Sequence, residues 1–161
     1  MTLVATQADH EAIPASIFRA YDIRGIAELQ LSKDSVRLIG QAIGSEALDQ
    51  NIATLLIGYD GRLSSPSLSI ALIEGIRSSG CNVVSLGLIP TPLLYFATHT
   101  TDFDSGVMLT ASHNPSNYNG LKVVFHQTSL AENQIQSLRS RIETNQLSTG
   151  DGGFDELDID K

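Results

Sequence analysis

The stretch TLLIGYDGRLSSPSLSIALIEGIRSSGCNVVSL, Thr54 to Leu86, contains two short apolar runs on either side of an amphipathic segment. TLLIGY and NVVSL are nearly continuous apolar runs, which is typical of parallel strands that are buried on both faces. Between them, Ser65 and Pro66 predict the N-cap and first turn of a helix, and Gly80 predicts its end. A strand, a helix and a second strand in this order predict a βαβ unit of a parallel sheet.

The same alternation of strands and helices continues on both sides of this unit. It predicts an α/β fold, with three α/β/α layers around a mainly parallel but mixed sheet. The flanking helices are expected from capping residues ahead of apolar positions at helical spacing, and the flanking strands from short apolar runs. The expected helices begin after Ser32 (about 33–48), at Thr91-Pro92 and at a capping box of Ser129 and Glu132, and the expected strands are Ser105–Ala111 and Leu121–Phe125.

The chain divides by composition into three parts. Residues 1–16 are small or polar without a period and predict a flexible leader. Residues 17–147 carry the α/β pattern, and 161 residues in all are enough to bury a substantial core. The last part, 148–161, is acidic and rich in glycine, which predicts a linker toward a further domain that this sequence does not contain.

Charge and cysteine content exclude several classes of function. The net charge of −8 disfavours nucleic acid as a partner, because phosphate backbones attract basic surfaces. No apolar run approaches the length of a membrane span, so we expect no membrane partner and a cytoplasmic protein. Cys81 is the single cysteine, so it can form no internal disulfide, and its apolar surroundings predict a buried, unreactive thiol.

A polar loop interrupts the apolar runs at LTASHNPSNYNGLKVV, Leu109 to Val124. Ser112 stands beside His113, but adjacent side chains in an extended segment point to opposite sides, and no G-x-S-x-G pattern surrounds the serine. Geometry therefore argues against a hydrolase nucleophile. The second alternative is a turn, in which Asn114-Pro115 bends the chain and Asn119-Gly120 closes a hairpin.

The third alternative for this loop is a phosphate site. The loop is longer than the roughly two to five residues that a hairpin needs, and it follows a strand of an α/β sheet, where ligand sites usually lie. Lys122 can neutralise a bound anion. Two other loops supply suitable groups: Arg24 next to a glycine, and Asp60 with Arg62 after a buried strand. Each Arg–Asp pair taken alone is also compatible with a surface ion pair.

At this point the sequence resembles the α-D-phosphohexomutase family, in its bacterial phosphomannomutase/phosphoglucomutase branch. The resemblance is carried by FRAYDIRG (Phe18 to Gly25), GYDGR (Gly58 to Arg62) and, most specifically, TASHNPSNYNGLK (Thr110 to Lys122). It covers essentially the whole chain but only the first of the four domains of the family. It therefore implies the fold of that first domain, and further domains 2–4 of the same polypeptide as partners of this one.

The resemblance also implies a reaction and residues that perform it. Ser112 matches the phosphoserine that exchanges a phosphoryl group with hexose phosphates, such as mannose 1-phosphate and glucose 1-phosphate and their 6-phosphates, through a bound hexose 1,6-bisphosphate. Lys122 and Arg24 match catalytic and substrate-binding positions near the phosphoserine, Tyr21 matches a position that lines the ligand cleft, and His113 matches a supporting histidine. Asp60, Arg62, Asn114, Asn119 and Gly120 fall in the supporting loops.

Magnesium is implied in the same way. In the family Mg²⁺ is held by an aspartate-rich loop of the second domain together with a phosphoserine oxygen, so only Ser112 of this chain would contribute a ligand. No other His, Cys or carboxylate spacing predicts a metal site, and His99 and His126 are expected to be solvated or to cap helices. We expect the chain alone to fold without turnover. The alternatives are a non-catalytic phosphosugar-binding module, or a phosphoglucosamine mutase of the same family.

Overall fold

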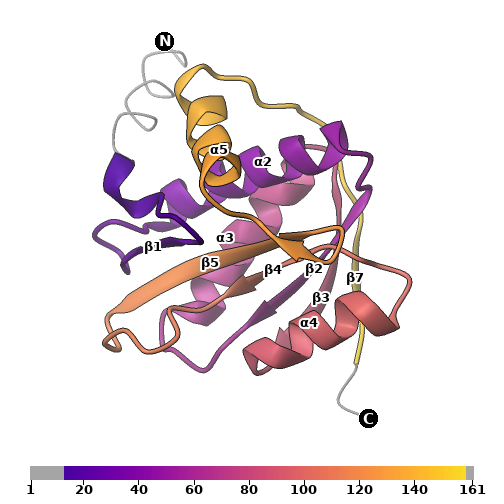
Figure 1. The fold of residues 1–161 in the computed structure, drawn as a ribbon, viewed down its shortest axis with the longest axis horizontal. Helices are drawn as coiled ribbons and strands as arrows, with labels where there is room; N and C mark the ends of the chain where they lie inside the picture. Colours follow the sequence, from indigo (N-terminus) through magenta and orange to yellow (C-terminus); the bar gives the residue numbers. More distant parts are fainter. Residues whose placement is uncertain (1–12, 159–161) are drawn as a thin grey trace.

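The centre of the molecule is a mixed β-sheet flanked by helices, described over residues 13–158 in a computed structural model (Figure 1). The elements are η1 (Ala15–Ile17), β1 (Ile23–Ile26), α2 (Lys33–Asp49), β2 (Thr54–Tyr59), α3 (Ser65–Ser78), β3 (Asn82–Leu88), α4 (Thr91–Thr100), β4 (Gly106–Leu109), β5 (Tyr118–Phe125), β6 (Thr128–Ser129), α5 (Asn133–Glu143) and β7 (Phe154–Glu156). The predicted leader lies mostly outside the described residues, which begin at residue 13.

The strand order is β1-β5-β4-β2-β3-β7, and β6 pairs with β5 outside this path. β2 runs parallel to β3 and β4, and β7 runs parallel to β3. β5 runs antiparallel to its three partners β1, β4 and β6. The sheet is therefore parallel in its β4-β2-β3-β7 part and antiparallel around β5, and the predicted α/β class with a mixed sheet is confirmed.

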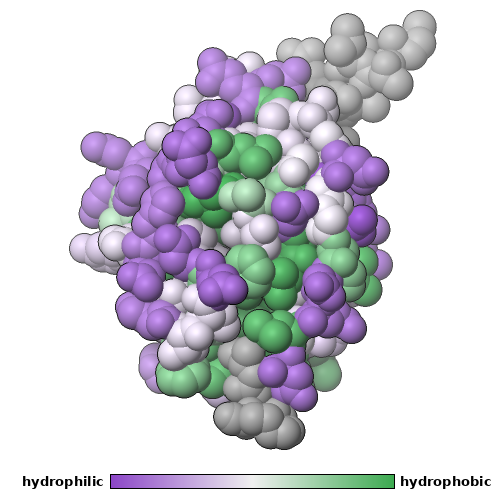
Figure 2. Space-filling view, turned by 90° about the vertical axis from the view of Figure 1, so that its right-hand side faces the viewer, coloured by the Kyte–Doolittle hydropathy of each residue, from purple (hydrophilic) through white to green (hydrophobic). Residues whose placement is uncertain are grey.

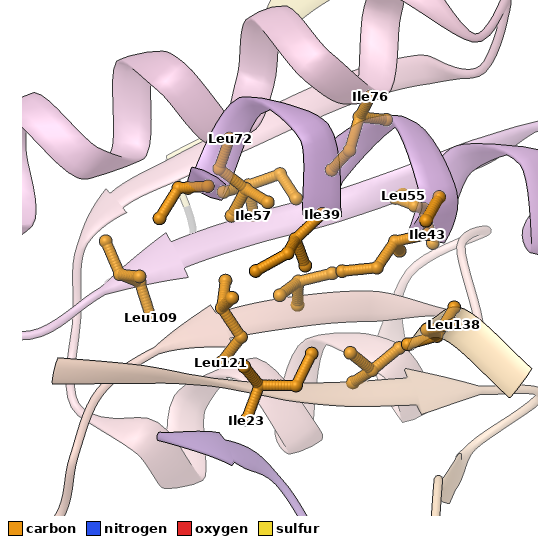
Figure 3. Packing of buried hydrophobic residues seen from close by; sticks show 14 of the residues in the cluster. Ile23, Ile39, Ile43, Leu55, Ile57, Leu72, Ile76, Leu109, Leu121 and Leu138 are labelled. Atoms are coloured by element: carbon orange, nitrogen blue, oxygen red, sulfur yellow. The ribbon is translucent and has the colours of Figure 1, made fainter. Parts of the chain in front are cut away.

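Two layers of helices cover the sheet, and the strand residues alternate between them. Leu55 and Ile57 of β2 belong to the core that α2, α3 and α5 cover, whereas Leu56 belongs to the core on the α4 side. This alternation follows from the pleat, which turns successive side chains to opposite faces. In Figure 1, α2 and α5 lie above the sheet and α4 lies below it, and Figure 3 shows Ile39 of α2 and Leu72 of α3 near Ile57. Burial on both faces explains why the β2 and β3 runs are apolar throughout.

The helix starts differ in part from the predicted ones. Ser32 caps α2 as expected, and Ser35 closes a capping box with it. In α3 the N-cap position is held by Ser64 rather than Ser65, because the Ser65 hydroxyl donates instead to Asp60, at 2.9 Å.

The capping box predicted for the last helix is wrong. Ser129 belongs to β6, and Glu132, at the N-cap of α5, has φ 47° and no side-chain capping bond. A tight turn at His126 and Gln127, both with positive φ, leads β5 back into β6 and removes Ser129 from the helix start. The turn was not predicted because neither residue is one of the glycines or asparagines that usually occupy such positions.

The predicted linker also differs from the structure, up to the end of the described residues. The N–H of Gly150 donates to the carbonyl of Ser78, and the N–H of Gly152 donates to that of Arg77, both at 2.8 Å. β7 then adds to the edge of the sheet beside β3. The composition suggested a linker because β7 is acidic, but its backbone pairs with β3 while its side chains stay exposed.

Figure 2 views the molecule from the side on which β7 forms the edge of the sheet. Hydrophobic residues lie in the middle of this face, between hydrophilic ones (Figure 2). The exposed large hydrophobic side chains include Leu88 of β3 and Phe154 of β7. The guanidinium carbon of Arg77 lies 5.9 Å from the centre of the Phe154 ring, a cation–π contact that further ties β7 to α3.

Two single residues behave as the sequence indicates. Cys81 is buried, and this burial raises the pKa of its thiol to about 11, so that the unreactive thiol form prevails at neutral pH. His126 sits at the end of α2, where its Nε2 lies 3.2 Å from the carbonyl oxygen of the C-cap residue Gln50. A hydrogen bond to Asp104 and this backbone contact raise the pKa of His126, which favours a cation at the helix C-terminus.

Among the described residues, no helix has the length and apolar character that a membrane span requires.

α2 and α3 approach closely at two glycines, Gly40 and Gly75. A Cβ at Gly40 would lie 2.7 Å from the carbonyl oxygen of Leu72, and a Cβ at Gly75 would collide with the carbonyl oxygen of Arg37. Both obstacles are backbone atoms, which cannot rotate away as side chains can. The distance between these helices is therefore set by the absence of side chains at the two positions.

We predict that Gly75→Ala lowers the free energy of unfolding by roughly 1–3 kcal/mol, the usual effect of overpacking. The loss occurs although alanine has a helix propensity about 1 kcal/mol better than glycine. Urea unfolding of the two proteins measures the difference. Gly61→Ala is the matched control, since a Cβ there would meet no atom within 4 Å. Equal stability of Gly75→Ala and the wild type would contradict the close approach.

Candidate functional site

The serine loop, residues 110–117, connects the carboxyl end of β4 to β5. Ser112 lies in this loop with φ 54°, in the left-handed region that residues other than glycine rarely occupy. Its side chain is exposed, and within residues 13–158 no group donates to or accepts from its hydroxyl. The strained backbone is held in place by the rest of the loop, which is the usual condition for such a conformation to persist.

Arg62 holds the serine loop through backbone carbonyl groups. Its Nη1 donates to the carbonyl oxygens of Pro115, at 2.7 Å, and Tyr118, at 3.1 Å. Its Nη2 donates to the carbonyl oxygens of Ser112, at 2.8 Å, and Asn114, at 2.9 Å. We call these four hydrogen bonds the Arg62 clamp. The planar guanidinium with its fixed donors suits this role, which a single ammonium group could not fill.

The clamp changes the expectation for Arg62. The sequence left open whether Arg62 contacts an anion or forms a surface ion pair. In the structure its main role is a different one, holding the loop. It is only 12% exposed, its Nε lies 3.4 Å from Asp60, and both terminal nitrogens are used by the loop. Arg62 is thus a supporting residue of the serine loop.

Asp60 connects the clamp to the start of the loop. Its Oδ2 accepts a 2.6 Å hydrogen bond from the Thr110 hydroxyl, whose oxygen in turn accepts from the N–H of Ser112 at 3.1 Å. Its Oδ1 accepts from the hydroxyl of Ser65, in the first turn of α3, at 2.9 Å. One carboxylate therefore links β2, α3 and Thr110, two residues before the serine, in a chain of hydrogen bonds that reaches the backbone of Ser112.

Asn119 and Gly120 do not close a hairpin, because β5 already begins at Tyr118. The amide nitrogen of Asn119 is buried and donates to the hydroxyls of Ser64, at 2.8 Å, and Ser65, at 3.1 Å. Gly120 lies opposite Arg24 in the β1–β5 register, where a Cβ would come within 3.0 Å of the Thr110 carbonyl oxygen. The Asn-Gly pair therefore serves packing between strands and the α3 start rather than a turn. Asn114 bends the loop as expected, with its side-chain amide donating to the carbonyl of Ala111 at 2.8 Å.

Arg24 and Lys122 meet at a carboxylate that the sequence did not single out. Asp22 is 4% exposed, and its Oδ2 lies 3.2 Å from Nη2 of Arg24 and 3.6 Å from Nζ of Lys122. Arg24 is on β1 and Lys122 on β5, the two strands that meet beside the serine loop. The side chains of both cations are partly open to solvent, so together they offer positive charge to an incoming anion.

The two other predicted site residues are exposed. Tyr21 stands 69% exposed just before β1, and His113 follows the serine on the surface of the loop. The ring nitrogens of His113 have no hydrogen bond within the part of the chain that the structure describes. Both side chains are available to a ligand but are not yet oriented by the protein.

The serine loop also borders an open hollow of about 800 Å³. Its walls come from two residues just after β1, the Asp60–Ser64 loop, Ser67 of α3, and three residues of the serine loop, Asn114, Ser116 and Asn117. None of Ser112, Arg24 and Lys122 is among the residues that line it. The hollow is therefore next to the cation pair but distinct from it.

The described residues do not provide a complete metal site. Within residues 13–158 no group of three or more His, Cys, Asp or Glu side chains comes together in a way that could hold an ion. Asp22 and Asp60 are instead paired with basic or hydroxyl groups. A divalent cation at Ser112 would need further ligands from outside these residues.

Comparisons with known proteins agree with the fold. The family model described as phosphoglucomutase/phosphomannomutase, alpha/beta/alpha domain I, matches residues 15–149. A phosphomannomutase/phosphoglucomutase of Pseudomonas aeruginosa is 50% identical over 147 residues, which cover 91% of this chain and 32% of that protein. A phosphoglucomutase of Neisseria gonorrhoeae is 41% identical over 150 residues, covering 92% of this chain and 33% of that protein.

A solved structure gives the same result. The crystal structure of a phosphoglucomutase/phosphomannomutase family protein from Burkholderia thailandensis superposes with a TM-score of 0.89 at 41% identity. The match covers 91% of this chain and 34% of that one. The chain thus spans about a third of the length of the relatives it matches.

We predict that Arg62→Lys loosens the serine loop and lowers the free energy of unfolding by roughly 1.5–3 kcal/mol, the usual cost of a lost hydrogen bond to a charged group. Amide hydrogen exchange in residues 110–118 should become faster, because the lysine ammonium cannot reach four carbonyls at once. Arg139→Lys is the matched control, since Arg139 makes only exposed side-chain contacts, an ion pair with Glu143 and a hydrogen bond to Gln136. Unchanged exchange in the loop of Arg62→Lys would show that the clamp does not hold it.

Proposed function

Since this chain belongs to the phosphoglucomutase/phosphomannomutase family, whose α/β/α domain I it carries, we propose that Ser112 transfers a phosphoryl group to and from hexose phosphates. One observation carries the proposal most: an exposed, unengaged serine hydroxyl on a rigidly held loop next to two cations, Arg24 and Lys122. Phosphoryl transfer needs such positioning and charge neutralisation more than it needs covalent chemistry from the protein.

In the proposed reaction, phosphoserine 112 gives its phosphoryl group to the free hydroxyl of a hexose monophosphate. The new P–O bond forms to the sugar oxygen, the bond to the Ser112 oxygen breaks, and the proton of the sugar hydroxyl ends on the Ser112 oxygen, which becomes a hydroxyl. The product is a bound hexose 1,6-bisphosphate. This intermediate then reorients, and its other phosphoryl group returns to the Ser112 oxygen. The serine hydroxyl gives up its proton, and the sugar oxygen that is released takes up a proton. Mannose and glucose 1- and 6-phosphates are the proposed substrates.

The proposed roles of the neighbouring residues follow from their charge and exposure. A phosphoserine carries about −1.5 to −2 charges, so Arg24 and Lys122 stabilise the transferring oxygens. Lys122 also assists proton transfer, and His113 supports it from the loop. Tyr21 offers an exposed aromatic ring to the sugar. Asp60, Arg62, Asn114, Asn119 and Gly120 keep the loop in place.

We propose that Mg²⁺ binds at the phosphoryl oxygen of Ser112, with its remaining ligands supplied by another domain. Such an ion would add positive charge at the transferring group. The described residues supply no cluster for it, so the proposed steps are assigned to side chains of this chain, with Ser112, Arg24 and Lys122 at the transferring group. Domains 2–4 of a longer polypeptide are the proposed source of the metal ligands and of contacts that read the sugar.

The phosphoserine is tested by intact-mass measurement after incubation with glucose 1,6-bisphosphate. We expect the wild-type chain to gain an adduct of about 80 Da, one phosphoryl group, and Ser112→Ala to gain none. Ser116→Ala is the matched control, because Ser116 is an exposed serine of the same loop, and this variant should keep the adduct. An adduct that persists in Ser112→Ala, or that never forms in the wild type, would refute the proposal.

We also predict that the purified 161-residue chain does not convert mannose 1-phosphate to mannose 6-phosphate. Accepting one phosphoryl group is a single step, whereas a full cycle requires the bisphosphate to be retained and turned over. The groups that would retain it are the ones proposed to come from domains 2–4. A coupled assay that detects mannose 6-phosphate measures this, and steady conversion would contradict the prediction.

The two alternatives differ in these tests. A non-catalytic phosphosugar-binding module would bind phosphate at Arg24 and Lys122 without any adduct at Ser112. A phosphoglucosamine mutase would form the same phosphoserine and differ only in the sugar that it accepts. The exposed, hydrogen-bond-free hydroxyl of Ser112 favours a covalent role over binding alone.

A further inference from the structure

Asp22 is buried beneath the cation pair. Only 4% of its side chain is exposed, against 30% for Arg24 and 28% for Lys122. Among the described residues it is the one buried side chain that is charged. A buried carboxylate is costly unless cations and hydrogen bonds compensate it, so its position beneath two cations requires an explanation.

The carboxylate contacts both cations at once. Oδ1 accepts from Nη2 of Arg24 at 3.3 Å, and Oδ2 lies 3.2 Å from the same nitrogen and 3.6 Å from Nζ of Lys122. The Arg24 contact is a hydrogen-bonded ion pair, whereas the Lys122 contact is longer than a hydrogen bond. Lys122 can therefore turn to another anion without first breaking a hydrogen bond to Asp22.

The three charges are layered. Arg24 lies opposite Gly120 in the sheet, and Lys122 lies two residues further along β5, so both side chains project from the same face. Asp22 immediately precedes β1, and its carboxylate, less exposed than either cation, contacts both. A phosphoryl group that approaches from solvent meets the cations first, and the carboxylate remains behind them as a fixed negative charge.

We propose that Asp22 is a resident counter-anion that competes with the phosphoryl group for Arg24 and Lys122, and so limits how tightly the site binds it. This inference rests on the proposed function, since it assigns the two cations to the phosphoryl group. Asp22 does not touch the reacting atoms and acts only through the cations, as a positioning residue.

Weaker binding suits a phosphoryl group that must be transferred in both directions. Binding energy that is equally strong before and during transfer does not speed the transfer, and it slows release. Two cations without a counter-anion would form a site of net charge +2, whereas with Asp22 the net charge is +1. The carboxylate also keeps the two like charges together when no phosphoryl group is present.

The test is the affinity of the unphosphorylated chain for inorganic phosphate, measured by isothermal titration calorimetry at low ionic strength. Asp22→Asn keeps the shape and removes the charge, and we expect it to bind phosphate about tenfold more tightly. A merely structural role of Asp22 would have the opposite effect, since a damaged site binds less. Unchanged or weaker binding by a folded Asp22→Asn would overturn the proposal.

Asp104→Asn is the matched control for the change in net charge. Asp104 also pairs with a basic group, His126, but it precedes β4, whereas the serine loop follows this strand. This variant should bind phosphate as the wild type does. If it also binds about tenfold more tightly, a general charge effect explains the result, and the proposal for Asp22 is wrong.

Two further variants separate this proposal from the proposed function. Arg24→Ala and Lys122→Ala should each weaken phosphate binding. If neither does, the cation pair is not the anion site and the proposed function loses its charge-neutralising groups. If both do and Asp22→Asn leaves the affinity unchanged, the anion site stands and only the role of Asp22 fails.

A measurement on the wild type avoids any risk that Asp22→Asn does not fold. The side-chain carboxyl carbon of Asp22 in a ¹³C-labelled chain should shift as phosphate is added, because its cation partners turn to the ligand. The carboxyl carbon of Asp104 should not shift. No change at Asp22 while phosphate saturates the site would contradict the competition.

Discussion

The Arg62 clamp is the interaction on which the site depends. One guanidinium, reaching from the loop after β2, donates to four carbonyl oxygens of the segment 112–118 and so holds Ser112 at a positive φ. The Oδ2 atom of Asp60 lies 3.4 Å from Nε of Arg62 and also accepts the hydrogen bond of the Thr110 hydroxyl. Because the four carbonyls converge on one rigid group, the loop is positioned before any ligand arrives, and the serine hydroxyl is left free to react.

The fold supplies the cations through strand pairing. β1 is brought beside β5 in antiparallel register, and this pairing, rather than closeness in sequence, places Arg24 near Lys122. Gly120 permits the approach, since a Cβ there would crowd the Arg24 backbone. A held serine and a pair of cations thus come from separate parts of the chain that only the sheet unites.

Much of the fold followed from local patterns, and much of the site did not. Apolar runs and capping residues predicted the βαβ core, because burial on both faces of a strand leaves a strong signal. The alternative in which Asn119-Gly120 closes a hairpin is not found in the structure. The actual partners of Asn119, Ser64 and Ser65, are distant in sequence and could not be predicted from it. Asp22 was missed for the same reason: Asp22 and Arg24 are only two residues apart, but nothing in the sequence showed that Lys122 joins them. Local residue types predict helices and strands, whereas contacts between segments distant in sequence determine what each site residue does.

The central claim is that Ser112 carries a phosphoryl group whose oxygens contact the two cations, Arg24 and Lys122. A crystal structure of the chain phosphorylated at Ser112 tests it most directly. The account predicts phosphoryl oxygens within about 2.7–3.2 Å of Nζ of Lys122 or a guanidinium nitrogen of Arg24, with the Arg62 clamp unchanged. A phosphoryl group directed into solvent, with Arg24 and Lys122 still paired only to Asp22, would contradict it.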